Sequence, residues 1–134
     1  MAKQIFVNLP IGNLKASMAF YDALGFKNNP HFTNDDAACM VYSDTINVMI
    51  HTPKSWRRFT DRPIPPSSSS EVMLALSVDN AKEVDAMNDV AKANGGHADI
   101  NPKQDLGFMY SRAFTDPDGH IWEPFWMDQA AIQA

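Results

Sequence analysis

The order strand, helix, strand, strand, strand occurs twice in this chain, and this repeat restricts the fold more than any other feature. In the first half, residues 4–9 are predicted to form a strand, and a helix is predicted from Leu14 to Gly25. Asn13 is a suitable N-cap for that helix, and Gly25 supplies the left-handed residue that commonly ends one. Three short extended runs separated by turn residues follow, at 26–32, 37–42 and 46–51.

The second half repeats this order. Residues 71–78 are predicted to form a strand, and a helix capped by Asn80 is expected to end just before Gly95. Three more extended runs are expected near 97–100, 108–114 and 120–126. When residues 6–13 are aligned with residues 73–80, the strand, the turn and the helix cap coincide, which indicates an internal repeat.

A unit of this kind leaves one face of its sheet uncovered, so two units placed side by side can bury that face jointly and leave a concave surface. The sequence therefore predicts an α+β fold in which two tandem βαβββ units form a curved mixed-sheet cup. We expect one domain over residues 1–134, with unit one at 1–52 and unit two at 71–134. Residues 53–70 contain PIPPSSSS and are predicted to be the linker, because prolines prevent regular strand pairing.

Composition and charge argue against several classes of partner. The chain has 11 Lys and Arg against 16 Asp and Glu, a net charge of -5, so it lacks the positive field that attracts nucleic acid. Its apolar runs are far shorter than the ~20 residues of a membrane-spanning helix, and its first residues lack the pattern of a signal peptide. We therefore expect a cytoplasmic protein that binds neither nucleic acid nor membranes.

Two local features have ordinary structural interpretations. Cys39 lies in the strand-like run AACMVY, where a buried, inert thiol is expected and a reactive thiol is the alternative. The cluster Trp56-Arg57-Arg58-Phe59 could stack on bases or bind an anion. We prefer a short amphipathic turn in which Trp56 and Phe59 pack inward and the arginines are solvated.

Three segments carry a resemblance to a known family: VNLPIGNLKASMAFYDALGF near the start, ALSVDN at the second strand-helix junction, and FTDPDGHIWEPFW near the end. With these segments the chain resembles the vicinal oxygen chelate superfamily, which includes glyoxalase I, bleomycin-resistance proteins and extradiol dioxygenases. Within it the chain is most similar to small bacterial proteins described as predicted lactoylglutathione lyases or glyoxalase-like proteins. The resemblance implies the two-unit cup and a homodimer.

The resemblance also implies where a metal site would lie, with one ligand on the first strand and one on the last strand of each unit. The matching positions are Phe6, Met49 to within one residue, Met73 and Glu123. Family enzymes place histidine, glutamine or glutamate at the first three. Because a phenyl ring cannot bind metal and a thioether is a poor ligand for hard divalent ions, we predict no metal cofactor. A divalent metal is the alternative, and Met49 and Met73 are interpreted as apolar lining.

His51 is a weak candidate for completing a metal site with Glu123. It lies two residues beyond Met49, so strand alternation places its side chain on the same side as those of Met49 and Asn47. The ordinary alternative is a solvated or hydrogen-bonded histidine at a strand end.

Glu123 is the candidate catalytic residue. Apolar residues at the other three positions, together with Phe125, would favour its neutral form, which a general acid or base needs. The alternative is a structural carboxylate that accepts hydrogen bonds from Tyr110, Arg112 or a backbone amide. Alternation places Glu123 on the same strand face as Phe125.

Further residues are candidate ligand contacts. Asn8 shares a strand face with Phe6 and could orient a ligand by a hydrogen bond, or it could make a turn contact at the strand end. Arg112 could clamp an anion or lie at the rim of the cup. The full set of candidate ligand contacts is Phe6, Asn8, Met49, Met73, Tyr110, Arg112 and Phe125.

The function expected from these residues is that of a glyoxalase-like protein whose cup takes a small, partly apolar ligand without the standard four-ligand metal site. Whether the protein is an enzyme is left open. One alternative is a metal-dependent lyase or isomerase similar to lactoylglutathione lyase. Another is a drug-sequestering protein that resembles bleomycin-resistance proteins. The apolar stretch IWEPFWM exceeds what one strand normally exposes to water and agrees with the implied homodimer.

Overall fold

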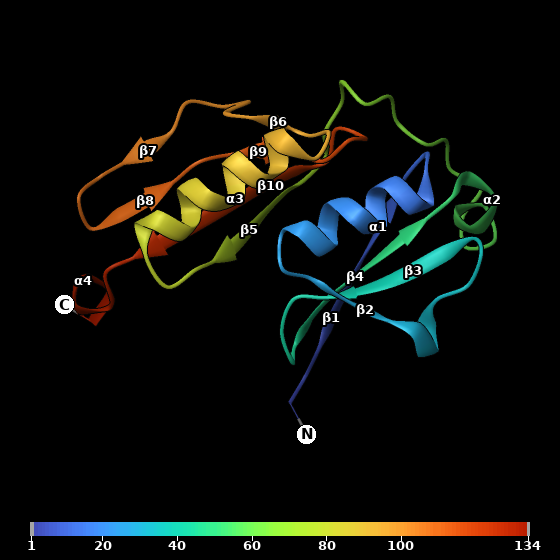
Figure 1. Ribbon diagram of the computed structural model, residues 1–134, viewed down its shortest axis with the longest axis horizontal. Coiled ribbons are helices and arrows are strands. Elements are labelled where there is room, and N and C mark those ends of the chain that lie inside the picture. The colour runs from blue at the N-terminus through green and yellow to red at the C-terminus, as the bar shows by residue number, and fades with distance from the viewer. Residues whose placement is uncertain (1, 134) are drawn as a thin grey trace. The chain divides into compact units, whose positions relative to one another are not determined.

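The computed structural model describes residues 2–133, so positions 1 and 134 of the predicted domain lie outside the described residues. The chain divides into two compact units, Met1–Pro66 and Ser67–Ala134, and this division falls inside the segment predicted to be the linker. Each unit has the predicted α+β order, with a first strand, a helix and then a series of strands (Figure 1). The predicted fold class, two tandem βαβββ units, is confirmed.

Unit 1, drawn in blue to green in Figure 1, contains β1 (Ile5–Pro10), α1 (Leu14–Ala23), β2 (Lys27–Asn29), η1 (Pro30–Phe32), β3 (Ala37–Val41), β4 (Ile46–His51) and α2 (Pro53–Trp56). Its sheet has the order β1-β4-β3-β2, in which β1 and β4 are parallel and the other pairs are antiparallel. Leu9, Val48 and Ile50 alternate toward the buried side of this sheet. The helix α1 covers that side, and the other side carries Phe6 and Met49.

The helix α1 begins and ends as its sequence predicts. The side chain of Asn13 accepts a hydrogen bond from the Ala16 amide at 3.0 Å, and Gly25 adopts a left-handed φ of 101° after the last turn. Phe20 and Tyr21 of this helix are fully buried, and the Tyr21 ring meets that of Phe26 edge-on at 5.3 Å. These aromatic side chains therefore join the helix to the sheet.

Two parts of unit 1 differ from the prediction. Residues 30–32 form a 3-10 turn instead of continuing the second strand, because Pro30 cannot donate to a strand pair and Asn29 caps the turn. The start of the predicted linker forms the helix α2, which is capped by Thr52 and followed by an ion pair from Arg58 to Asp36 at 3.3 Å. This segment is therefore part of unit 1.

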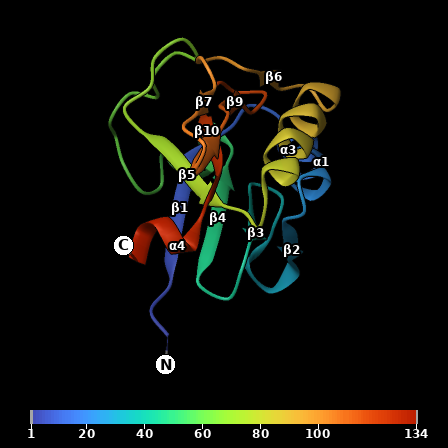
Figure 2. The ribbon, with the colours of Figure 1, turned by 90° about the vertical axis from the view of Figure 1, so that its left-hand side faces the viewer.

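Unit 2, drawn in yellow-green to red in Figure 1, contains β5 (Met73–Ser77), α3 (Ala81–Ala93), β6 (His97–Ala98), β7 (Gln104–Asp105), β8 (Met109–Ser111), β9 (Phe114–Thr115), β10 (Ile121–Met127) and α4 (Gln129–Gln133). The central strand β10 is parallel to β5 and antiparallel to β8 and β9. The single strand predicted at 108–114 is thus divided into β8 and β9. The helix α3 packs against β10 (Figure 2), and Trp122 and Pro124 of that strand are buried.

The helix α3 has a reciprocal cap. The Asn80 side chain accepts from the Glu83 amide at 3.0 Å, and the Glu83 carboxylate accepts from the Asp79 amide at 2.8 Å. Val84, the first buried residue of the helix, follows directly. None of the helices in the described part of the chain is long and apolar enough to cross a membrane.

The segment DPDGH, part of the third segment that carries the family resemblance, forms a tight turn between β9 and β10. Asp116 is fully buried, and one of its carboxylate oxygens accepts from the amides of Asp118 and His120 at 3.0 and 2.9 Å. Gly119 has a left-handed φ of 92°, and a side chain there would overlap the backbone of Ser67. The motif therefore has a structural role in positioning the start of β10.

Candidate functional site

Each unit presents two of the four positions at which family enzymes carry a metal ligand. In unit 1, Asn8 of β1 pairs with Met49 of β4. In unit 2, Ala75 of β5 pairs with Glu123 of β10. Asn8 lies two residues after Phe6, and Ala75 lies two residues after Met73, so Met49 and Glu123 occupy equivalent places in the two sheets. This equivalence supports the choice of Met49 over its neighbours.

These positions lie on the sheet faces that the helices do not cover. Phe6 is 44% exposed and Met73 is 56% exposed, high values for large apolar side chains. Ile121, which pairs with Met73, lies on the same face of β10 as Glu123 and Phe125. The prediction that Met73, Glu123 and Phe125 share one sheet face is therefore confirmed, whereas their contact with a ligand stays a prediction.

Glu123 is half-buried on that face. Tyr110 and Arg112, proposed as its hydrogen-bond partners, donate to aspartates instead, so this interpretation of Glu123 is wrong. Within residues 2–133, the carboxylate of Glu123 takes part in no hydrogen bond or ion pair. A half-buried carboxylate without a protein partner is able to accept hydrogen bonds from a ligand or to exchange a proton with one.

Arg112 is the centre of a charged cluster on the helix-covered side of unit 2. Its guanidinium donates to both carboxylate oxygens of Asp99, at 2.9 and 2.7 Å, and to Asp85 of α3 at 2.8 Å. The Tyr110 hydroxyl donates to the same oxygen of Asp85 at 2.7 Å. Arg112 lies between β8 and β9, where the strand is interrupted. The structure thus places Tyr110 and Arg112 across the sheet from Glu123, not beside it.

The hydrogen bonds in this cluster shift the pKa values of its members. The hydrogen bond from Tyr110, followed by that from Arg112, holds the pKa of Asp85 below its usual value. The hydrogen bonds from Arg112 hold the pKa of Asp99 below its usual value as well. The hydrogen bond to Asp85 raises the pKa of Tyr110. All three groups therefore favour the ionisation states that keep the cluster bonded, which indicates a structural clamp between α3 and the sheet.

A wide groove of about 820 Å³ lies over this cluster. Asp89 and Lys103 add charges to its lining, but the Arg112 guanidinium is already bonded to two carboxylates. An anion would have to displace Asp85 or Asp99 to reach Arg112, so an anion clamp is not favoured here. The role of Tyr110 and Arg112 in ligand binding stays a prediction.

His51 ends β4 on the uncovered side of unit 1, the side that also carries Met49 and Asn47, as alternation predicted. Only 3% of it is exposed. Its Nδ1 lies 2.8 Å from the Ser55 hydroxyl, and its Nε2 lies 2.8 Å from Oδ1 of Asn8. Burial lowers the pKa of His51 below its usual value, so the neutral ring is favoured. Since both ring nitrogens are engaged, His51 is a hydrogen-bonded strand-end histidine.

The residues at the four family positions do not fit a divalent metal. They offer one carboxylate, two thioethers and a phenyl ring, whereas a catalytic divalent site needs about three nitrogen, oxygen or thiolate donors. Across residues 2–133, no group of three or more His, Cys, Asp and Glu side chains is arranged to hold a metal ion. Cys39 is fully buried in β3 as expected, and its burial raises the pKa of its thiol.

Sequence reasoning missed Ser55, Asp85 and Asp99. Ser55 was assigned to the linker, although Thr52 followed by Pro53 is a recognisable helix start. Asp85 lies on the helix, and Asp99 adopts a left-handed φ of 53° after β6. No local spacing relates these aspartates to Arg112, so the cluster becomes visible only in the folded chain.

Similar solved structures share this architecture. A hypothetical protein of S. aureus, SA1046, is 26% identical with a TM-score of 0.78, over 94% of this chain and 95% of that chain. A glyoxalase/bleomycin resistance protein/dioxygenase family enzyme from Burkholderia phytofirmans PsJN is 17% identical with a TM-score of 0.76, over 94% and 99%. The fosfomycin resistance protein FosX from Listeria monocytogenes is 16% identical with a TM-score of 0.67, over 97% of each chain. The last two identities are low enough to show the fold alone.

Comparison of the sequence with curated proteins finds no match, whereas comparison with protein families finds one. Residues 3–123, which cover most of both units and all four positions discussed above, match the family profile described as Glyoxalase/Bleomycin resistance protein/Dioxygenase superfamily. This match confirms the resemblance to the superfamily, and the chain belongs to the glyoxalase/bleomycin resistance protein/dioxygenase superfamily.

Proposed function

We propose that this protein binds a small, partly apolar molecule at its uncovered sheet faces and does so without the four-ligand metal site of its family. The observation that carries this proposal is the chemistry at the four family positions, where Phe6, Met49 and Met73 replace metal donors and Glu123 alone remains. An unbranched thioether side chain adapts to ligands of different shape, so Met49 and Met73 suit a binding surface.

Glu123 supplies the polar contact in this proposal. Its carboxylate lies on the same face as Met73 and Phe125, and the described residues leave it without a partner. A ligand hydroxyl or amine would satisfy it by a hydrogen bond. If the protein turns a ligand over, Glu123 is the residue that we assign as general acid or base.

Two alternatives differ from this proposal in what they require. A lyase or isomerase similar to lactoylglutathione lyase needs a bound divalent ion or a second acid-base group beside Glu123. A drug-sequestering role is consistent with the fold of the fosfomycin resistance protein FosX and with an aromatic residue, Phe125, on the uncovered face of the last strand. The low identity to that protein lends fold-level support alone.

We also propose a cytoplasmic homodimer whose ligand is a small molecule and not nucleic acid or a membrane. Large apolar side chains that are exposed on the described surface and not assigned to ligand binding support a protein partner: Ile5, Phe32, Val72, Leu106 and Phe108. Light scattering at micromolar concentration should give twice the mass of the 14.9 kDa chain, and a monomer mass would contradict this part of the proposal.

Elemental analysis of protein purified without chelator is the most direct test. We expect far less than one divalent metal per chain, and we expect that added Zn or Ni confers no lactoylglutathione lyase activity. A stoichiometric metal would contradict the proposal. A small-molecule screen by NMR should then perturb Met73 and Glu123, and Glu123→Gln should weaken those hits while leaving the fold intact.

A further inference from the structure

A cavity of about 220 Å³ lies inside unit 1, at the end of its uncovered sheet face. Five residues line it: Asn8 of β1, His51 of β4, and Trp56, Phe59 and Thr60 from α2 and the turn that follows. Lys54 of α2 and Arg58, two residues after it, form ion pairs with Asp36, the residue before β3. The cavity therefore depends on the segment that sequence reasoning assigned to the linker.

Aromatic rings form the walls of this cavity. The His51 ring meets the Trp56 ring at 6.0 Å and the Phe59 ring at 5.4 Å, with interplanar angles of 66° and 62°. Trp56 is half-buried, but Phe59 is 76% exposed, so the expectation that both rings pack inward is wrong for Phe59. An aromatic ring left this exposed beside a cavity gains contact area when a ligand enters.

The polar groups at the cavity are arranged to donate hydrogen bonds. Because Oδ1 of Asn8 can only accept, Nε2 of His51 carries the proton, and the Ser55 hydroxyl donates to Nδ1. The amide nitrogen of Asn8 makes one long contact, 3.4 Å, to the Phe6 carbonyl and keeps an N–H for another partner. The Thr60 hydroxyl accepts from the Arg62 amide at 3.2 Å and still has its own hydrogen to donate.

The lining carries no net charge. His51, which is 3% exposed, is held between two neutral partners, and the other four lining residues are not ionisable. A charged ligand would lose its hydration here without a countercharge, whereas a neutral ring would not. In size, a cavity of roughly 150 Å³ accommodates benzene. A single substituted ring therefore fits this one.

From these contacts we propose that this cavity is a binding subsite for a neutral molecule, or part of a molecule, with a single aromatic ring and a hydrogen-bond acceptor. The ring packs between Trp56 and Phe59, and the acceptor takes hydrogen bonds from Asn8 and Thr60. The subsite deepens the proposed function and rests on it, because it names the ligand class for one end of the uncovered face. It requires no metal ion and no contribution from Glu123.

Benzamide is a suitable probe, since it is neutral, has one ring and carries a carbonyl acceptor. It is titrated into the full-length 15N-labelled protein while the indole N–H of Trp56 is followed by NMR, with that signal assigned from the Trp56→Phe variant. We expect a saturable shift with a dissociation constant of about 1 mM, an ordinary affinity for a molecule of this size. Cyclohexanecarboxamide, which lacks the aromatic ring, and benzoate, which is charged, should each bind several-fold more weakly.

Two exposed phenylalanines of unit 1 give a matched pair of variants. Phe59→Ala should weaken benzamide binding by about fivefold, because one aromatic wall is lost. Phe32→Ala removes a ring of similar exposure that does not line the cavity, and it should leave binding unchanged. Both side chains are exposed, so neither variant should impair folding.

Several outcomes would overturn the subsite. One is the absence of a saturable Trp56 shift, and another is an equal effect of Phe59→Ala and Phe32→Ala. Benzamide shifts confined to Met73 and Glu123 would also overturn it, while leaving the proposed function intact. Conversely, a saturable Trp56 shift in protein that contains stoichiometric metal would support the subsite and contradict the proposed function.

Discussion

In unit 1 the strand β3 runs without interruption from Ala37 to Val41, whereas in unit 2 the corresponding segment is divided into β8 and β9 around Arg112. The polar features at the ends of the units also differ. In unit 1, His51 ends the last strand and is buried with both ring nitrogens engaged. In unit 2, Glu123 lies on the last strand without a described partner. The two units share strand order and pairing, but their polar chemistry has diverged.

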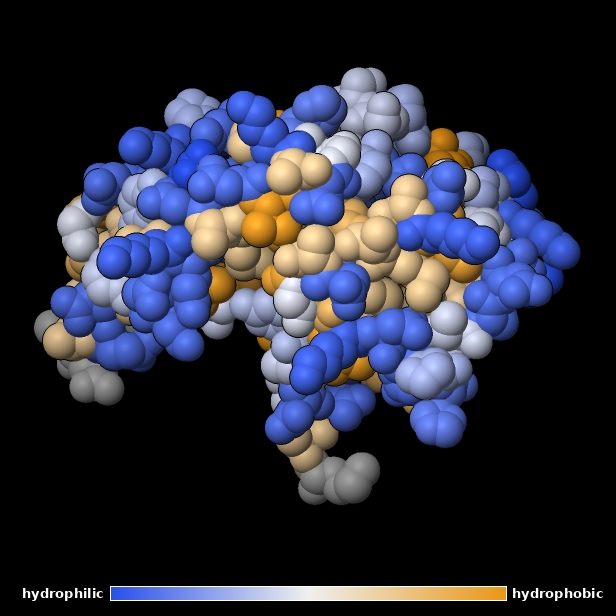
Figure 3. Space-filling view, in the orientation of Figure 1, coloured by the Kyte–Doolittle hydropathy of each residue, from blue (hydrophilic) through white to orange (hydrophobic). Residues whose placement is uncertain are grey.

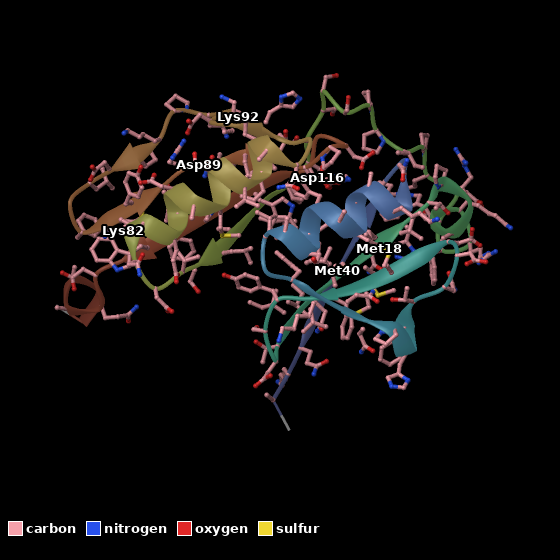
Figure 4. The ribbon with its side chains drawn as sticks, viewed as in Figure 1. Met18, Met40, Lys82, Asp89, Lys92 and Asp116 are labelled. Atoms are coloured by element: carbon pink, nitrogen blue, oxygen red, sulfur yellow. The ribbon has the colours of Figure 1, made fainter. Side chains whose placement is uncertain are left out.

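The exposed surfaces of the two main helices also differ in polarity. Ala16, Ala19 and Ala23 are exposed on α1, and apolar side chains predominate where this helix reaches the surface in Figure 3. Lys82, Asp89 and Lys92 lie along the exposed side of α3 (Figure 4). Both helices are buried on the side that faces their own sheet, with Phe20 in α1 and Val84 in α3 fully covered. The two helices therefore share a pattern of buried residues that packs each one on its own sheet, and they differ in the polarity of their exposed residues.

The largest expected difference between the units concerns their left-handed glycines. Gly25→Ala, in unit 1, meets no neighbouring atom, so it should cost about 1–2 kcal/mol of unfolding free energy from backbone strain. Gly119→Ala, in unit 2, adds an overlap with the backbone of Ser67 and should cost about 3 kcal/mol or more. Urea denaturation followed by tryptophan fluorescence measures both values. Equal costs would show that the Ser67 segment moves aside freely.

The unfolding free energy lost when a charged cluster is broken should also differ between the units, but by a smaller amount. Arg112→Gln breaks the bonds to Asp85 and Asp99, and it should cost about 1.5 kcal/mol, a value reduced because both carboxylates are 48% exposed. Arg58→Gln breaks the ion pair with Asp36, in which the arginine is 54% exposed, and should cost less than about 0.5 kcal/mol. Chemical denaturation of the two variants gives the comparison. A loss at Arg58 as large as that at Arg112 would contradict the assignment of the Arg112 cluster as the structural clamp.

These contrasts also show which parts of the structure could be read from the sequence. The helix caps Asn13 and Asn80, the terminating glycines and the alternation along β10 are local patterns, and the structure confirms them. The interruption at Arg112 could not be predicted, because the residues 108–114 look continuously extended. At the interruption, the Arg112 side chain donates hydrogen bonds to two aspartates from distant parts of the chain.

For the candidate site too, the features that depend on local patterns could be predicted from the sequence, and those that depend on distant contacts could not. Alternation placed Glu123 and Phe125 on one face, since that depends on neighbours along a strand, and the family resemblance placed Met73 on the same side. Tyr110 and Arg112 could not be placed in this way, because the face of an interrupted strand is set by contacts across the fold. The helix α2 was overlooked since the prolines and serines that follow it dominate the segment. That omission concealed Ser55, one of the two partners of His51.

The units should lose stability at different pH values. The pKa of His51 is lowered by burial, so the unfolded chain takes up a proton as the pH falls through about 6.5 while the folded chain resists it. Acidification below about pH 6.5 should therefore destabilise unit 1. The pKa values of Asp85 and Asp99 are lowered by hydrogen bonds, so their stabilising contribution to unit 2 is complete above about pH 4 and lost below it.

Amide hydrogen exchange resolves this difference, because it reports opening separately for β4 and for β10. Between about pH 7 and pH 5, after correction for the intrinsic exchange rate, protection should fall in unit 1 more than in unit 2. In His51→Gln this selective loss should disappear. Loss of the buried hydrogen bonds should also lower the overall stability of that variant by about 1–2 kcal/mol. A parallel fall in both units in the wild-type protein would exclude His51 as the cause.

The smallest expected effect on stability comes from making the equivalent positions of the two units alike. Glu123→Met gives β10 the residue that β4 has as Met49, and because Glu123 has no described partner, the unfolding free energy should change by less than about 0.5 kcal/mol. The variant should nevertheless change the binding of any ligand that perturbs Met73 in the NMR screen, since the carboxylate of Glu123 is gone from that face. Met49→Gln, the matching change in unit 1, alters a proposed ligand contact without removing a charge. If Glu123→Met is destabilised by more than about 1 kcal/mol and binds ligand like the wild type, Glu123 is a structural residue and not part of the site.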